Sequence, residues 1–149
     1  MTINSDELNS LGEAFYGAVS SRFAHGLLIV SAPESRDVHE GWDPAVDAVH
    51  AAPDSLYVAV QQAATAPVWV ACVAGPYVPN GLERLFAGEI NLPRAELAIY
   101  DPNEMVNLRL AVDFESNSVE IYGNNTYEST ELVIVLSGRE RVGAVDGSP

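Results

Sequence analysis

The side chains in this sequence that could do chemistry are mostly carboxylates, and they are densest in its second half. Residues 96–131 contain eight acidic side chains and a single basic one, Arg109. The acidic residues are Glu96, Asp101, Glu104, Asp113, Glu115, Glu120, Glu128 and Glu131. A surface of this charge attracts basic proteins over a distance and repels other polyanions. The segment therefore indicates binding rather than a reaction.

The apolar pattern inside this segment predicts a β-hairpin. Every second residue from 106 to 114 is apolar, residues 115–118 favour a turn, and the alternation resumes over residues 119–122. On adjacent strands, Asp113 and Glu120 would project from the same outward face, with Tyr122 nearby. Carboxylates around an aromatic ring are what a mimic of nucleic acid presents to a nuclease. A solvated sheet face without a partner is the alternative.

We expect the partner-binding surface to combine these carboxylates with two aromatic side chains. The expected residues are Asp101, Glu104, Asp113, Glu115, Glu120, Tyr122 and Trp42. Trp42 precedes an Asp-Pro pair, which is a common helix start. Its indole either packs that helix against the sheet or lies exposed at a binding edge.

Metal binding is a second interpretation of the polar residues. Asp43, Asp47 and His50 fall at i, i+4 and i+7, so a helix would place them on one face, where they could ligate zinc or iron. Carboxylates in a first helical turn are also explained by the helix dipole. Asp101, Asn103 and Glu104 offer oxygen ligands in a loop, without the spacing of a known calcium loop. We expect no cofactor, and a β-sandwich module that binds a divalent metal or small ligand is the alternative function.

Catalytic patterns are missing from the sequence. It contains no Gly-x-Ser-x-Gly elbow and no glycine-rich phosphate loop. The single cysteine, Cys72, lies in the apolar run 68–74 without a basic neighbour, so we expect a buried, unreactive thiol beside a buried Trp69. The sequence thus predicts a protein that is not an enzyme.

The overall charge excludes some partners and leaves others open. The 149 residues carry 21 acidic and 7 basic side chains, a formal net charge of −14, and every basic residue is arginine. Direct binding to nucleic acid or to an anionic membrane needs cationic surface, so we expect neither. A basic protein partner remains possible, and so does acidity that serves only solubility. The lone cysteine, the absence of a cationic leader and the lack of long apolar runs lead us to expect a cytoplasmic protein.

The periodicity along the chain predicts a single domain, residues 1–149, built mainly from strands. We expect an N-terminal helical extension over residues 1–21, with the helix itself at 5–21, a second short helix at 42–51, and a flexible tail over 138–149. Besides the hairpin, strands are expected at residues 23–31, 55–61, 68–74, 85–90, 95–100 and 131–137.

These elements predict an antiparallel β-sandwich of about eight strands with one or two short helices. The continuous apolar runs at residues 27–30 and 132–136 indicate central strands. Residues 55–61 and 68–74 are expected to pair with each other across the turn between them.

One part of the chain resembles a known family. A strand at 23–31, a polar linker, the Gly41-Trp42-Asp43 start of an alanine-rich helix and a strand at 56–60 resemble the N-terminal half of competence protein J, over about residues 22–62. The Leu92-Pro93 turn is similar in type to one in that family. The family comprises small bacterial proteins that inhibit a DNA-entry nuclease. The resemblance implies a non-enzymatic inhibitor or immunity-type protein for a basic partner such as a nuclease or toxin.

Overall fold

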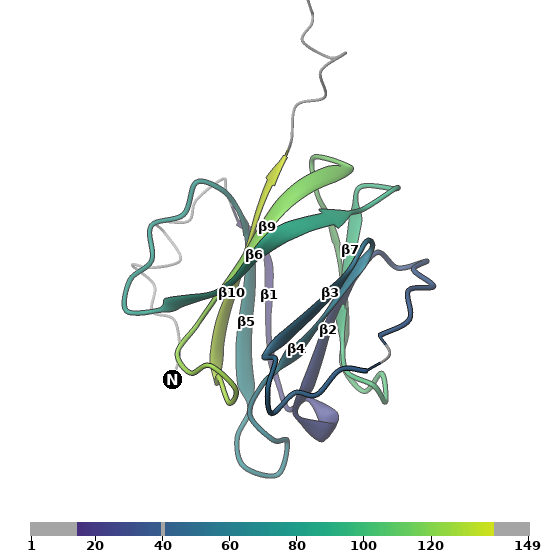
Figure 1. Ribbon diagram of the computed structural model, residues 1–149. Coiled ribbons are helices and arrows are strands. Elements are labelled where there is room, and N and C mark those ends of the chain that lie inside the picture. The colour runs from purple at the N-terminus through teal and green to yellow at the C-terminus, as the bar shows by residue number, and fades with distance from the viewer. Residues whose placement is uncertain (1–14, 40, 139–149) are drawn as a thin grey trace, which may run out of the picture.

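The structure is a computed structural model that describes residues 15–39 and 41–138. They form ten strands in two five-stranded sheets (Figure 1). The first sheet has the order β1-β5-β10-β9-β6, from strands β1 (Phe15–Ser21), β5 (Val68–Ala74), β10 (Glu131–Gly138), β9 (Ser116–Gly123) and β6 (Glu83–Asn91). The second has the order β3-β4-β2-β7-β8, from strands β3 (Val49–Ala52), β4 (Ser55–Ala59), β2 (Leu27–Ser31), β7 (Glu96–Tyr100) and β8 (Asn107–Ala111). The predicted mainly β, two-sheet fold class is confirmed.

The main core lies between the two sheets, where side chains from alternate positions of each strand meet. Its largest fully buried members are Phe23, Leu28, Leu56, Ile90, Leu92, Leu97, Ile99, Ile121, Leu132, Ile134 and Leu136. Both predicted central strands, β2 and β10, occupy the middle of their sheets. Strand β10 is apolar at consecutive positions because both of its faces are covered: Ile134 faces the main core, while Val133 and Val135 face a second apolar cluster.

The predicted hairpin at 106–122 is wrong, because its two strands belong to different sheets. Strand β8 pairs with β7, whereas β9 pairs with β6 and β10. The connection between them is tied to the preceding β6–β7 connection: the Val112 N–H donates to the Ala95 carbonyl (2.9 Å) and the Leu92 N–H donates to the Glu115 carbonyl (2.7 Å). The chain therefore crosses from one sheet to the other instead of folding back on itself.

The predicted pairing of residues 55–61 with 68–74 is also wrong. Strand β4 lies between β3 and β2, whereas β5 lies between β1 and β10 in the other sheet. The strand pairs are antiparallel except for β5 with β10, which is parallel. A short turn between two strands does not force them to pair when each can bury more surface against another neighbour.

Neither predicted helix forms in the described residues. Residues 15–21 are strand β1, paired with β5; Gly17 suits this position because an added Cβ would lie 2.5 Å from Leu110 Cδ2, where β1 meets the second sheet. Asp43 caps only a turn, and Val49 begins strand β3, paired with β4. The helical structure in the described residues is a single 3-10 turn, Ala24–Gly26. The rest of the predicted N-terminal helix, and the tail after residue 138, lie outside the described residues.

Burial confirms the two interior side chains predicted on β5. Cys72 is fully buried, and burial raises the pKa of its thiol to about 12. Because the thiol stays neutral, it is neither a nucleophile nor a metal ligand. Trp69 is buried on the opposite side of the same strand, in the second apolar cluster. In the described part of the chain, we find no helix with the length and apolar character that a membrane span requires.

Candidate binding surface

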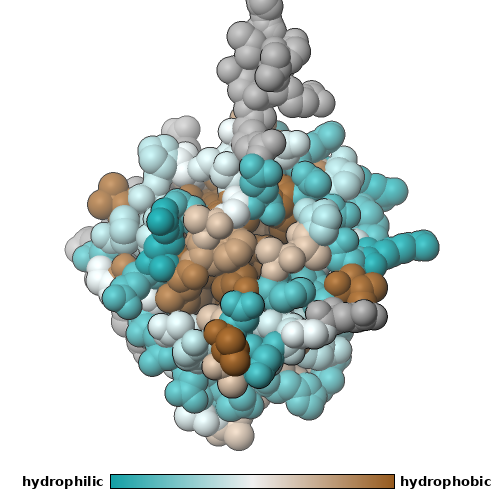
Figure 2. All heavy atoms as spheres, viewed as in Figure 1, coloured by the Kyte–Doolittle hydropathy of each residue, from teal (hydrophilic) through white to brown (hydrophobic). Residues whose placement is uncertain are grey.

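The outer face of the first sheet carries a second apolar cluster whose central residues are buried. Its apolar cluster is formed by Trp69, Ala71, Val73, Tyr122, Val133 and Val135, and Phe15, Ala18, Tyr77 and Leu82 pack against it. The rings of Tyr77 and Tyr122 lie 5.2 Å apart, so the β5–β6 connection covers part of this face. In Figure 2 hydrophilic residues dominate the view, and apolar residues gather in its middle, around the place where β6 and β10 lie in Figure 1.

Asp101, the first predicted acidic binding residue, is buried and holds loops together. Asp101 is 1% exposed. Oδ2 accepts a hydrogen bond from the Ala24 N–H (3.1 Å), and Oδ1 accepts from the N–H groups of Met105 (2.8 Å) and Val106 (3.3 Å). These bonds fix the 3-10 turn against the β7–β8 turn, so Asp101 does not contribute to an exposed acidic surface.

The predicted pair Asp113 and Glu120 does not share a face. Asp113 lies in the β8–β9 connection with Glu115 and accepts a hydrogen bond from the Tyr16 hydroxyl of β1 (3.0 Å). Glu120 forms an ion pair with Arg84 of β6 (3.0 Å), at the opposite edge of the first sheet. The predicted common face is therefore wrong, because it required the hairpin.

Tyr122 is not the exposed aromatic anchor that the sequence predicts. It is 8% exposed, and its hydroxyl donates to Glu120 Oε1 (3.3 Å). Burial, and then the adjacent Glu120 carboxylate, raise the pKa of Tyr122. This ring is part of the packing on the first sheet.

The remaining predicted residues, Trp42 and Glu104, lie on the outer face of the second sheet. A row of outward residues in register crosses all five of its strands: His50, Tyr57, Ile29, Tyr100 and Asn107. The β2–β3 connection lies over this row and adds two rings, His39 and Trp42. We call the set of His39, Trp42, His50, Tyr57 and Tyr100 the ring face.

Ring contacts hold the ring face together. His39 stacks on Tyr57 with 3.8 Å between centroids and 10° between planes. Trp42 meets Tyr57 edge-on at 5.6 Å and 73°. The indole N–H donates to the Asp47 carbonyl (2.7 Å), which anchors the ring without the helix that was expected around it. Trp42 therefore belongs to this cluster on the sheet surface.

A chain of hydrogen bonds fixes the orientation of His39. The Asp37 carboxylate accepts from the Ser55 hydroxyl (3.3 Å), so the Ser55 oxygen in turn accepts from His39 Nε2–H (2.6 Å). His39 Nδ1 is then an acceptor, and His50 Nδ1–H donates to it across 2.8 Å. A neutral His39 satisfies both of its contacts, whereas a protonated His39 keeps the contact with His50 only if His50 takes the other tautomer.

The local electrostatics favour the same neutral state. Burial is the main cause that lowers the pKa of His39, the neighbouring His50 lowers it further, and Asp37 partly opposes the change. The network is therefore built for pH values at which His39 carries no charge.

The predicted metal ligands Asp43, Asp47 and His50 do not share a helix face, because residues 43–48 form turns and His50 lies in β3. The described residues contain no group of three or more histidine, cysteine or acidic side chains arranged to hold a metal ion. The predicted shared metal-binding face is therefore wrong.

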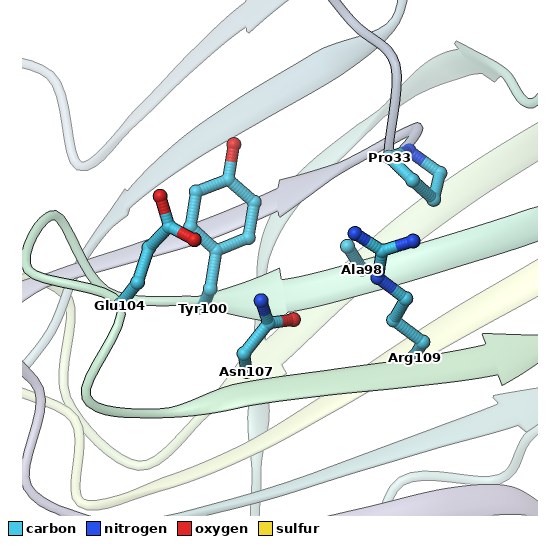
Figure 3. Close-up of a pocket in the computed structure, with 6 residues that line it drawn as sticks. All are labelled: Pro33, Ala98, Tyr100, Glu104, Asn107 and Arg109. Atoms are coloured by element: carbon cyan, nitrogen blue, oxygen red, sulfur yellow. The ribbon is translucent and has the colours of Figure 1, made fainter.

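A shallow hollow of about 100 Å³ adjoins the ring face. Pro33, Ala98, Tyr100, Glu104, Asn107 and Arg109 line it. Figure 3 shows Asn107 and Arg109 projecting from one strand and Tyr100 from its neighbour, with Glu104 beside the tyrosine ring. A carboxylate and a guanidinium thus border one small polar depression that is open to solvent.

The sequence signal for the ring face was present but incomplete. Tyr57 and Tyr100 stand at the outward positions of alternating strands, which marks them as surface residues. Nothing local indicates that these tyrosines are neighbours, because β4 and β7 both pair with β2 rather than with each other. His39 joins them only because a connection folds over the sheet.

Comparison with known proteins supports the fold and not a sequence family. No protein-family model matches the chain, and no curated protein matches its sequence. Among solved structures, the chain matches the crystal structure of ComJ, inhibitor of the DNA degrading activity of NucA, from Bacillus subtilis. The match has a TM-score of 0.67 and 9% identity over 84% of this chain and 97% of that one.

This chain has the fold of ComJ. The predicted resemblance to competence protein J is thus confirmed as a structural likeness, and it extends well beyond residues 22–62. A second match, to crocagin biosynthetic gene J, has a TM-score of 0.49 and 12% identity over 84% of this chain and 96% of that one. At 9% identity to ComJ, the arrangement of strands is retained while most side chains differ.

Proposed function

We propose that this chain is a non-enzymatic binding protein that inhibits a nuclease. The observation that carries the proposal is the structural match to ComJ, whose crystal structure is described as that of an inhibitor of DNA degradation by NucA. The match takes in nearly the whole of ComJ, so this chain retains the complete framework on which that inhibitor is built.

The charge of the chain supports a basic partner. Its net charge is −14, and nucleases recognise DNA through cationic surface. An acidic protein is attracted to the same surface and competes with the DNA backbone for it. We place this inhibitor in the cytoplasm, where a single buried thiol with no disulfide partner is usual.

The test of this proposal starts from the partner. The immobilised chain would be used to capture proteins from the source organism at low salt, and the fraction eluted by salt would be assayed for DNA degradation. Two sources of nuclease would be assayed: this eluted fraction and purified NucA. Adding back the chain should abolish degradation by at least one of them at a molar ratio near one to one.

Salt gives the second readout. Affinity between an acidic inhibitor and a basic nuclease should fall roughly tenfold or more between about 50 and 300 mM salt, since the charges that attract them are screened. A gel-shift assay with DNA and the chain alone is the control, and no complex is expected there. Undiminished degradation with both nucleases, at any ratio, would overturn the proposed function.

A further inference from the structure

We propose that the ring face is the surface that docks on the nuclease, and that it receives a basic protein surface through arginine and lysine side chains. This inference rests on the proposed function and identifies the site through which it acts.

The two outer sheet faces differ in how many of their aromatic rings remain accessible: Phe15 and Tyr77 are partly exposed at the first sheet, beside two buried rings. On the first sheet Trp69 and Tyr122 are buried within the second apolar cluster. On the second sheet His39, Trp42, His50, Tyr57 and Tyr100 are all partly exposed. Aromatic side chains that are already packed but still accessible are typical of the energetically dominant part of an interface.

Exposed aliphatic side chains occur in the connections that carry or border these rings. Val38 and Val46 are 69% and 72% exposed and occur in the same connection as Trp42. Met105 is 82% exposed and follows Glu104 at the hollow. These three are among the six large apolar side chains that are exposed in the described residues. Apolar side chains left in water around a ring cluster indicate a surface that a partner covers.

Carboxylates outnumber the arginines (Arg36, Arg94 and Arg109) in and beside the connections around the rings, which favours a basic partner. Asp37 is hydrogen-bonded to Ser55 below His39, Asp47 accepts the Trp42 indole through its carbonyl, and Glu104 borders the hollow. Glu34 and Asp43 lie in the β2–β3 connection, where Glu34 pairs with Arg94 (3.3 Å), and Asp54 lies in the β3–β4 turn. Burial, and then the nearby carboxylates of Asp37 and Glu34, raise the pKa of Asp54, as expected where negative charges gather.

This combination fits arginine and lysine better than other side chains. A guanidinium can stack on an indole, phenol or imidazole ring while it pairs with a carboxylate at the rim. The basic residues with which a nuclease holds DNA meet both requirements at once. An acidic or purely apolar partner would meet the carboxylates without compensation.

The rings are held in position before any partner arrives. Hydrogen bonds already restrict the rotamers of these side chains. One chain of bonds runs from His50 through His39 and Ser55 to Asp37, and another bond joins the Trp42 indole to the Asp47 carbonyl. A surface ordered in advance binds with a smaller entropic cost.

The experiment compares two double variants with the same change in net charge. Asp47→Lys/Glu104→Lys reverses two exposed carboxylates at the ring face, and Glu83→Lys/Glu89→Lys reverses two exposed carboxylates on β6. Inhibition of the nuclease found above would be measured for both, with thermal melting as the check on folding. We expect the first variant to lose roughly tenfold or more in affinity and the second to change by about threefold or less.

Trp42→Ala and Trp42→Phe provide an independent test without any change of charge. The alanine variant should lose affinity and the phenylalanine variant should recover much of it, because a ring is retained. Backbone hydrogen exchange in the wild-type complex should slow at residues 42–57 and 100–109 more than at 83–91.

The outcomes separate the two proposals. Equal losses of affinity in both double variants would mean that only net charge matters. A larger loss in the β6 variant would place the interface on the first sheet. Either result would overturn the ring-face assignment while inhibition by the wild type stands. Failure of the wild-type chain to inhibit either nuclease would overturn the proposed function, and this inference with it.

Discussion

His39 shows how one residue can couple the stability of this surface to pH. Its Nε2 donates to Ser55 and its Nδ1 accepts from His50, so the folded state favours the neutral ring. Burial, and then His50, lower the pKa of His39 below the ordinary value for histidine. The unfolded chain therefore takes up a proton at a higher pH than the folded chain does.

The sign of the resulting pH dependence follows directly. The contribution of His39 is fully present above about pH 6.5, the ordinary pKa of histidine, and is lost as the pH falls from there through the lower pKa of the folded state. We expect the free energy of unfolding of the wild type to drop more between pH 7.5 and pH 5 than that of His39→Asn, which cannot titrate. Urea denaturation at the two pH values measures both. Equal drops in the two proteins would contradict the neutral network.

At the scale of the element, strand β10 decides whether the first sheet is closed on both sides. Val133 lies on the outer side of β10, is 4% exposed and packs in the second apolar cluster. In a sheet with one solvated face, a threonine would be harmless at such a position. Here its hydroxyl would be buried without an arranged partner.

We therefore expect Val133→Thr to lower the free energy of unfolding by about 1–2 kcal/mol. Ser137→Thr, at an exposed position of the same strand, is the matched control and should change it by less than about 0.5 kcal/mol. Urea denaturation of both variants at neutral pH supplies the comparison. A neutral Val133→Thr would mean that this face is open to water.

Strand positions could be predicted from the sequence much better than strand partners. The apolar runs that became β5, β6, β7 and β10 are visible as local patterns. The partner of each strand depends on surface buried far along the chain, so Val106–Phe114 and Val119–Tyr122 suggested a hairpin that the fold does not contain. The Asp43-Pro44 helix start failed for the same reason: β3 gains a backbone ladder with β4 that a short isolated helix could not match.

The candidate site was predicted only in part. The density of carboxylates pointed to binding, but it could not distinguish the buried Asp101 from the exposed Glu104. Trp42 was identified and its neighbours were not, because Tyr57, Tyr100 and His39 come together only through the order of the second sheet and the connection over it.

On the scale of the whole molecule, the alternative function as a metal-binding module makes an opposite prediction. Calorimetric titration with calcium or zinc should show no heat of binding, and neither ion should raise the melting temperature. The reason is that carboxylates such as Glu120 and Asp101 are already engaged in the fold. The chain kept in a chelator is the control. Saturable heat with one ion per chain would favour the metal module over the inhibitor.

The parallel pairing of β5 with β10 also constrains how the molecule is made. Strand β10 ends at residue 138 and lies between β5 and β9, so without it the first sheet consists of two separate pairs, β1 with β5 and β9 with β6. A ribosome must therefore release the chain through residue 138 before this sheet can assemble, and contacts so distant in sequence are slow to form. Until then the apolar residues of β5 have no lasting cover, and the high negative charge of the chain would help to keep unfinished molecules apart.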